Sequence, residues 1–253
     1  MHLMNFPLLV FLITLLVLWL SARIGVYVCQ YRRAFDSGER EDLNVIVAAS
    51  LTLLGLIIGF TFSMAVTRYD QRKNYEEEEA NAIGTEYLRA SLLPSADATK
   101  IQQFLRAYLD QRILYYQIRD RQQREKIDRE TSRLQNELWS VVRDGARSDP
   151  SPITALAVSG MNDVLNSQGY TQAAWWNRIP IAAWGLMFAM AICCNGLLGY
   201  TAHLVAGKAH RYFILPLIVA VAFLLIADID SPRSGIIRVH PQNLESLAQS
   251  LQP

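Results

Sequence analysis

The chain has 253 residues, of which 51% are hydrophobic, and its formal net charge is +1 at pH 7. This balance argues against nucleic acid as a partner, because nucleic-acid-binding proteins carry a basic surplus on one face. Three cysteines without a C-x-x-C pair argue against a disulfide framework and against a zinc site. The apolar residues are concentrated in a few blocks, and the charged residues lie between them.

The first uncharged run extends from Leu3 to Ala22, close to the roughly 20 residues that span a bilayer. A cleaved signal peptide is the alternative, and it would need a basic segment before the apolar run. No Lys or Arg precedes Phe6. We therefore interpret this run as a retained transmembrane helix.

The second apolar block runs from about Asn44 to Thr67 and continues into a polar segment of good helix formers. No proline interrupts residues 42–87. We therefore predict one long helix that starts in lipid and ends in water. Within the block, Gly55 and Gly59 are spaced as small residues are where membrane helices approach closely.

A third span lies between Arg178 and Lys208, with tryptophans at its start that fit an interfacial aromatic belt. A fourth runs from Tyr212 to Ala227. It is short for a span at roughly 1.5 Å per residue. We expect it to continue past Asp228 or to lie partly buried in protein.

The region between the second and third spans, 68–177, has the periodicity of helices, with buried-type residues at three- and four-residue steps. These residues are Ile101, Leu105, Tyr108, Leu109, Arg112 and Tyr116, followed by Ile127, Leu134, Leu138 and Val141. Asp-Pro-Ser-Pro at 149–152 interrupts the pattern, and a further helix from Ile153 is expected to end near Gln168-Gly169.

The sequence therefore predicts an all-α protein with four transmembrane helices and a helical soluble region continuous with the second and third spans. Residues 1–67 hold the first two spans, 68–177 the soluble region, 178–230 the last two spans, and 231–253 a turn and tail. Basic residues are nearly balanced on the two sides of the predicted spans, so they set no orientation.

The second span carries no charged residue, which argues against a proton-coupled carrier. Thr52, Leu56 and Phe60 share one face of this helix. They form either the apolar constriction of a pore within a ring of subunits or a stripe that faces lipid and neighbouring helices. No hydrolase, P-loop, metalloprotease or dinucleotide motif occurs, so we expect no catalytic residue, cofactor or metal and no enzyme activity.

Two motifs carry a resemblance to a known family. Gly59-Phe60 is followed eight residues later by Arg68-Tyr69 and then by EANAIGTEYLRASLLP, and the tail contains LIADIDSPRSGIIRVHPQNLESL. With the order of two spans, a helical insert and two spans, these motifs resemble the bestrophin superfamily. The resemblance is closest to its bacterial bestrophin-like domain family.

The resemblance implies a pentameric, all-helical ion channel whose second helix lines the pore and whose neck consists of three apolar side chains. Leu56 and Phe60 match neck positions. Thr52 falls at the third position, where the family has an apolar residue. The resemblance also implies a location in the cell inner membrane, with both termini and the soluble region in the cytoplasm.

Arg68 and Tyr69 match the family's pair at the point where the pore helix leaves the membrane. Arg68 then braces the helix through an ion pair, forms a basic ring at the pore mouth, or serves only as an interfacial anchor. Asp228 and Asp230 match a turn that belongs to a calcium clasp in animal bestrophins. Since two acids fall short of the six to eight ligands of Ca²⁺, we favour a structural turn. The acidic run 76–79 is either a cation-attracting ring in a vestibule or a solvated charge run. We favour the solvated run, because its carboxylates point in different directions round the helix.

Two hypotheses follow. The first is an oligomeric channel of undetermined ion selectivity, whose partners are further copies of itself, the lipid bilayer and small inorganic ions. The alternative is a non-conducting membrane scaffold or sensor whose helical soluble region binds a partner. A carrier ranks third, because the spans lack an ionisable residue of the kind that carriers use.

Overall fold

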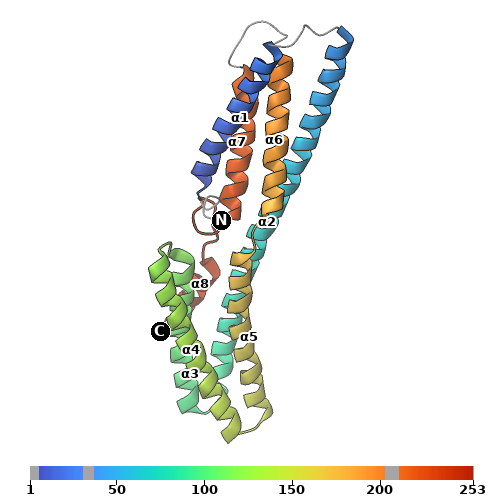
Figure 1. Ribbon diagram of the computed structural model, residues 1–253. Helices are drawn as coiled ribbons and strands as arrows, with labels where there is room; N and C mark the ends of the chain where they lie inside the picture. Colours follow the sequence, from blue (N-terminus) through green and yellow to red (C-terminus); the bar gives the residue numbers. More distant parts are fainter. Residues whose placement is uncertain (1–5, 31–36, 203–210, 253) are drawn as a thin grey trace. The chain divides into compact units, whose positions relative to one another are not determined.

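The computed structural model describes residues 6–30, 37–202 and 211–252. Figure 1 shows the helices, which are α1 (Pro7–Gln30), α2 (Ser37–Ala90), α3 (Ser95–Gln117), α4 (Arg121–Ser148), α5 (Pro152–Trp176), α6 (Ile181–Ala202), α7 (Arg211–Asp230) and α8 (Gln242–Ser250). The described residues contain no strand, which confirms the predicted all-α fold.

The chain divides into two compact units. We call Met1–Tyr69 with Arg178–Arg238 the span unit, and Asp70–Asn177 with Val239–Pro253 the insert unit. Helix α2 begins in the first and ends in the second. The residues of the predicted tail, 231–253, are divided between the two units.

Four helical stretches of described residues are long and apolar enough to cross a membrane. They lie in Pro7–Cys29, Glu41–Ala90, Pro152–Thr201 and Phe213–Asp230, and the third of these ranges includes the non-helical residues 177–180 between α5 and α6. The last of them shows that the fourth span continues past Asp228, one of the two outcomes expected. Helix α2 is uninterrupted, which confirms the long helix predicted over 42–87.

In the span unit, α1 packs against α6 and α7, and α6 packs against α7 (Figure 1). An aromatic cluster lies in its core. The ring of Phe223 meets those of Trp184 and Phe188 edge to face, with centroids 6.0 Å and 5.0 Å away. This geometry places the positive edge of one ring on the negative face of another. Leu18 and Leu54 are buried in the same core.

Glycines allow α1 and α6 to approach each other closely. A Cβ atom added to Gly25 would collide with the carbonyl oxygen of Gly196, and one added to Gly199 would collide with the carbonyl oxygen of Ala22. Small residues at such a crossing replace side-chain contacts by direct backbone contacts, as is common between membrane helices.

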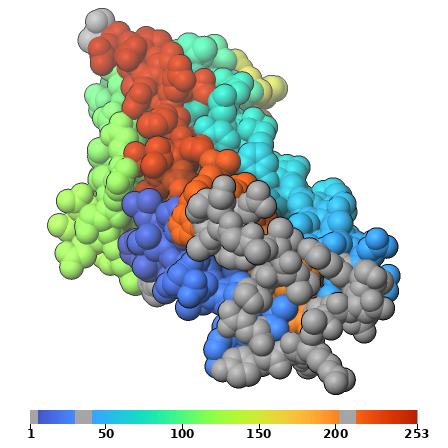
Figure 2. Space-filling model, turned by 90° about the horizontal axis from the view of Figure 1, so that it is seen from above, coloured from blue at the N-terminus to red at the C-terminus, as the bar shows by residue number. Residues whose placement is uncertain are grey.

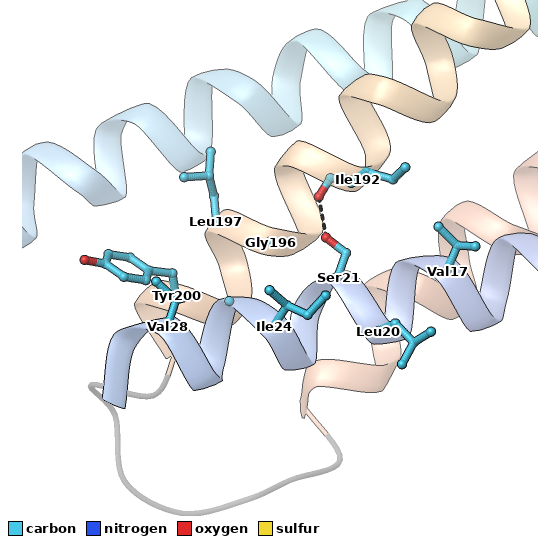
Figure 3. Close-up of a pocket in the computed structure, with 10 residues that line it drawn as sticks. Val17, Leu20, Ser21, Ile24, Val28, Ile192, Gly196, Leu197 and Tyr200 are labelled. Carbon is cyan, nitrogen blue, oxygen red and sulfur yellow. Dashed lines mark hydrogen bonds between the residues drawn. The ribbon is translucent and has the colours of Figure 1, made fainter. Parts of the chain in front are cut away.

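Beside this crossing, an open groove of ≈ 730 Å³ lies between α1 and α6. Figure 3 shows Ser21 of α1 pointing across it, where its hydroxyl donates a 2.7 Å hydrogen bond to the carbonyl oxygen of Ile192. The rest of the lining is aliphatic except for Tyr200. The groove therefore presents a mainly apolar surface.

In the insert unit, α3 packs on α4, α4 on α5, and α8 on α3. Every residue of the periodic pattern predicted between Ile101 and Val141 is buried. The fully buried side chains include Tyr108 and Leu138. The three- and four-residue steps of the sequence therefore identified the packed faces of α3 and α4.

Local capping contacts start α4 and α5. The Asp120 side chain accepts a 2.9 Å hydrogen bond from the backbone N–H of Gln123 and caps α4. At α5, the Ser151 side chain and the Thr154 side chain form a capping box, with Pro152 in the first turn. These contacts satisfy backbone N–H groups that a helix start leaves without partners.

The predicted end of α5 at Gln168-Gly169 is wrong, because the helix continues to Trp176. Thr171 and Trp175, beyond the glycine, are buried in the insert unit. The packing of this last stretch outweighs the roughly 1 kcal/mol by which a glycine weakens a helix interior.

Helix α8 was not predicted, since the sequence analysis assigned the C-terminal residues to a turn and tail. Its N-terminus is held by the Glu76 carboxylate, which accepts 2.9 Å hydrogen bonds from the backbone N–H groups of Asn243 and Leu244. The Leu247 side chain packs on Gly84, where an added Cβ would lie 3.0 Å from it. Figure 2 shows this C-terminal segment in red at the surface, beside the blue-green end of α2.

Candidate functional site: the open face of the second helix and its bracing contacts

The apolar half of α2 has two different faces. On one side its residues are buried in the span unit: Val47, Leu54, Thr61 and Ala65. On the other side lie Thr52, Leu56 and Phe60, the predicted neck residues, all of which are exposed. Leu56 and Phe60 are 53% and 63% exposed. Among the residues that the structure describes, none covers these three side chains.

The open face also carries small and hydroxyl residues. Ser63 and Thr67 follow Phe60 at three- and four-residue steps and are exposed. A Cβ atom added to Gly55 or Gly59 would meet no described atom within 4 Å. No contact within the described part of the chain therefore requires a glycine at either position.

Arg68 and Tyr69 lie where α2 leaves the apolar block. The Nη1 atom of Arg68 is 3.8 Å from the Oδ1 atom of Asp230, at the end of α7. Tyr69 is partly buried against the apolar core of the span unit. The same Asp230 carboxylate accepts a 3.1 Å hydrogen bond from the backbone N–H of Ile179. The structure therefore brings Arg68 and Asp230 together, as the bracing interpretation requires.

Asp228 has a separate set of partners. Its carboxylate accepts hydrogen bonds from the backbone N–H groups of Ile236, at 2.8 Å, and Ile237, at 2.7 Å. A Cβ atom on Gly235 would collide with the Asp228 carbonyl oxygen. Asp228 thus closes the turn that follows α7, and glycine is needed for the close approach of the returning chain.

These two aspartates are not arranged as the calcium site that the resemblance suggested. Their carboxylates point to different partners, and both already accept backbone N–H donors. A cation would have to displace those donors and would face the Arg68 guanidinium beside Asp230. Among the residues that the structure describes, no group of three or more His, Cys, Asp or Glu is placed to hold a metal ion.

The acidic run 76–79 behaves differently from the solvated run expected. Glu77 and Glu78 are exposed, but Glu76 and Glu79 have 1% and 0% exposure. Residues three apart on a helix lie on the same side, so one face of the run is buried and the other is in solvent. The solvated interpretation is therefore wrong for two of the four glutamates.

Glu79 belongs to a buried polar network that sequence reasoning missed. Its carboxylate pairs with the Nε of Arg112 on α3, whose Nη2 lies 3.3 Å from the second carboxylate oxygen. That oxygen also accepts a 3.1 Å hydrogen bond from the Thr171 hydroxyl of α5. Tyr116 donates a longer bond of 3.5 Å. Three helices of the insert unit are joined at this one carboxylate.

The charge state of the network follows from its contacts. Burial alone would lower the pKa of Arg112, but the adjacent Glu79 carboxylate raises it well above its usual range. The guanidinium also lies over the Tyr115 ring, 4.5 Å from the centroid, a favourable cation–π arrangement. Arg112 therefore remains charged. One sequence signal was available, because an arginine within an apolar periodic pattern requires a buried acid as its partner.

The fold and the open face of α2 define a four-span, all-α membrane protein. The Bestrophin-like domain family model matches residues 8–244, so the chain belongs to that family. No curated protein matches the chain.

Solved structures show the same fold at low sequence identity. A variant of a bacterial bestrophin homologue from Klebsiella pneumoniae has a TM-score of 0.65 and 13% identity, over 95% of this chain and 97% of that chain. The homologue solved by zinc phasing has a TM-score of 0.61 and 14% identity, over 96% and 99%. A variant described only as a membrane protein has a TM-score of 0.62 and 15% identity, over 95% and 97%.

Proposed function

We propose that the protein is an ion channel in which copies of the chain form a ring, with α2 lining the axis. The observation that carries this proposal is the uncovered stripe Thr52, Leu56, Phe60, Ser63 and Thr67 on a span whose opposite side is buried. Small inorganic ions would pass along this stripe.

The composition of the stripe supports a channel over a surface that only faces lipid. Leu56 and Phe60 alone would suit lipid tails. Ser63, Thr67 and the open glycines Gly55 and Gly59 suit a water-filled path and close helix neighbours instead, because small residues let membrane helices approach.

Family membership supports the finer details of the proposal. Five copies, an inner-membrane location and cytoplasmic termini are what the bestrophin resemblance implies. In such a ring, Leu56 and Phe60 form an apolar neck that can gate by dewetting. Thr52 leaves the third neck position polar. An apolar neck discriminates weakly by charge, so the proposal assigns no selectivity.

We propose no catalytic role for any residue of this face. The side chains are aliphatic, aromatic or hydroxyl groups. The hydroxyls of Thr52 and Thr67 each donate 2.9 Å hydrogen bonds to helix carbonyl oxygens, those of Ala48 and Ser63. Because these hydroxyls already donate to the helix backbone, we propose that they line the ion path and do not act as nucleophiles.

The first test is the oligomeric mass of the full chain in nanodiscs, measured by native mass spectrometry. A closed ring of five supports the channel. A monomer or dimer contradicts it, since the stripe would then face lipid. That outcome would favour the alternative function, a non-conducting scaffold or sensor whose insert unit binds a partner.

The second test is the conductance of the reconstituted protein. Phe60→Ala and Leu56→Ala widen the neck and should raise single-channel conductance. Phe62→Ala is the matched control, because Phe62 is also exposed but lies two residues on, about 200° round the helix. Equal effects of Phe60→Ala and Phe62→Ala, or no effect of either, would contradict the neck assignment.

A further inference from the structure

One buried acid of the insert unit takes no part in the channel proposal or in the Glu79 network. Glu86 of α2 has no exposed surface, and both of its carboxylate oxygens are buried without a hydrogen-bond partner among the described residues. Ile83 and Ala90, about one turn before and after it, are also fully buried. The carboxyl group therefore lies inside the packed face of α2.

The carboxyl group of Glu86 contacts α5 at a glycine. A Cβ atom added to Gly160 would collide with the Oε2 atom of Glu86 and with the Nη1 atom of Arg89. The carboxyl group thus rests directly on the α5 backbone. Met161 and Val164, which follow on α5, have no exposed surface. The contact lies near solvent on its outer side, since Arg89 is partly exposed and Asp163 is exposed.

Two charged groups act on the Glu86 carboxyl, one from each helix of the contact. Burial raises the pKa of Glu86 to about 8, while Arg89, on α2, lowers it and Asp163, on α5, raises it. Arg89 forms no ion pair with Glu86 within 4.0 Å among the described residues. Arg89 therefore offsets only part of the cost of burial, because neither carboxylate oxygen accepts a hydrogen bond among the described residues. A buried carboxylate without hydrogen bonds is disfavoured in its ionised form and takes up a proton more readily.

We propose that Glu86 is a proton-binding site in the contact between α2 and α5. Its carboxyl group is protonated at neutral pH. As the medium becomes alkaline the proton is released, and the negative charge of the carboxylate then forces the two helices apart at this contact. The ligand is a proton, and the device is a pH-sensitive joint within the insert unit. It stands whether or not α2 lines a channel.

The direction in which pH changes the folding stability follows from the difference between the pKa of Glu86 in the unfolded and the folded chain. The pKa of a glutamate in the unfolded chain is 4.5, and burial raises that of Glu86 to about 8. The folded state therefore binds more protons between these values. The stability that Glu86 contributes is present at acidic pH, falls as pH rises from about 4.5 to about 8, and stays lost above that.

The test uses the full chain in nanodiscs and follows the infrared carbonyl band of protonated carboxylic acids. Wild type should show a protonated-acid band at pH 7 that is largely lost by pH 9. Glu86→Gln should lack this component while keeping the fold, because the amide has the shape of the neutral acid. The same band in wild type and Glu86→Gln would overturn the proposal.

Two neighbouring variants separate proton binding from a purely structural role. Asp163→Asn removes a negative neighbour at an exposed position and should shift the titration midpoint to lower pH. Arg89→Gln removes a positive neighbour and should shift it to higher pH. Opposite shifts of the infrared midpoint support the site, and an unmoved midpoint in both variants contradicts it. The melting temperature should fall with pH over the same window in wild type and less in Glu86→Gln.

Discussion

The Arg112 guanidinium and the Glu79 carboxylate have no exposed side-chain surface and are joined by two contacts. In a buried pair, each partner offsets the desolvation of the other, so removal of one leaves an uncompensated charge. Thr171 and Tyr116 complete the set of donors to the same carboxylate. This group of side chains holds α2, α3 and α5 in one arrangement.

We expect Arg112→Ala to destabilise the insert unit by roughly 3–5 kcal/mol, because Glu79 would remain buried without its partner. Thermal unfolding of the full chain, followed by circular dichroism, would measure the loss. Arg133→Ala is the control, since Arg133 pairs with Glu130 and Glu137 on the exposed face of α4. Exposed pairs contribute about 0–1 kcal/mol. Equal losses for the two variants would show that the buried network is not a brace.

The turn after α7 gives a second prediction at the scale of single residues. Asp228→Ala removes the acceptor for the backbone N–H groups of Ile236 and Ile237, which should cost about 1–3 kcal/mol. Ca²⁺ and a chelator should leave the melting temperature of the wild type unchanged. A rise of several degrees with Ca²⁺ that Asp228→Ala abolishes would instead show a calcium site.

At the scale of helices, the crossing of α1 and α6 depends on backbone contact. Gly199→Ala places a methyl group against the carbonyl oxygen of Ala22, and Gly25→Ala places one against that of Gly196. Forced overpacking of this kind typically costs 1–3 kcal/mol. We expect both variants to lower the melting temperature of the protein in detergent.

The control for this prediction is on the same helix. Gly185 of α6 has no described atom within 4 Å of an added Cβ, and Gly185→Ala should be neutral or slightly stabilising. If Gly199→Ala and Gly185→Ala had the same melting temperature, α1 and α6 would not be in direct backbone contact at this crossing.

The helices also show where local sequence signals are reliable. The Asp-Pro-Ser-Pro segment predicted a break followed by a helix from Ile153, and α5 indeed begins at Pro152, one residue earlier. The Gln168-Gly169 pair looked like an end signal, yet α5 continues through it. The reason lies in residues distant in sequence, since the Thr171 hydroxyl donates to Glu79, 92 positions earlier. A local signal cannot include such a contact.

At the scale of the whole molecule, four membrane crossings would leave both termini and the insert between the second and third spans on one side of the membrane. We expect this side to be the cytoplasm. Protease should digest the insert in inside-out vesicles and leave it intact in right-side-out vesicles. A C-terminal reporter active only in the cytoplasm checks the tail. Digestion of the insert from outside would reverse the orientation that the family resemblance implies.

Much of the architecture was predictable because its signals are local. The four spans appear as long uncharged blocks, and the helices of the insert unit appear as periodic buried residues such as Ile101 and Leu138. The motif residues Arg68 and Phe60 indicated the family before any contact was known. Helix α8 was missed because its nine residues are stabilised by Glu76 and Gly84, more than 150 positions earlier.

By itself, the sequence determined the all-α class, the number of spans and the uncharged character of the second span, since these depend on composition and on periods of a few residues. Only the tertiary structure decided which acids are buried. Glu76, Glu79 and Glu86 have the same side chain as the exposed Glu77 and Glu78. Their different surroundings arise from α3, α5 and α8, which lie far along the chain. Burial is a property of those contacts, and no short stretch of sequence contains them.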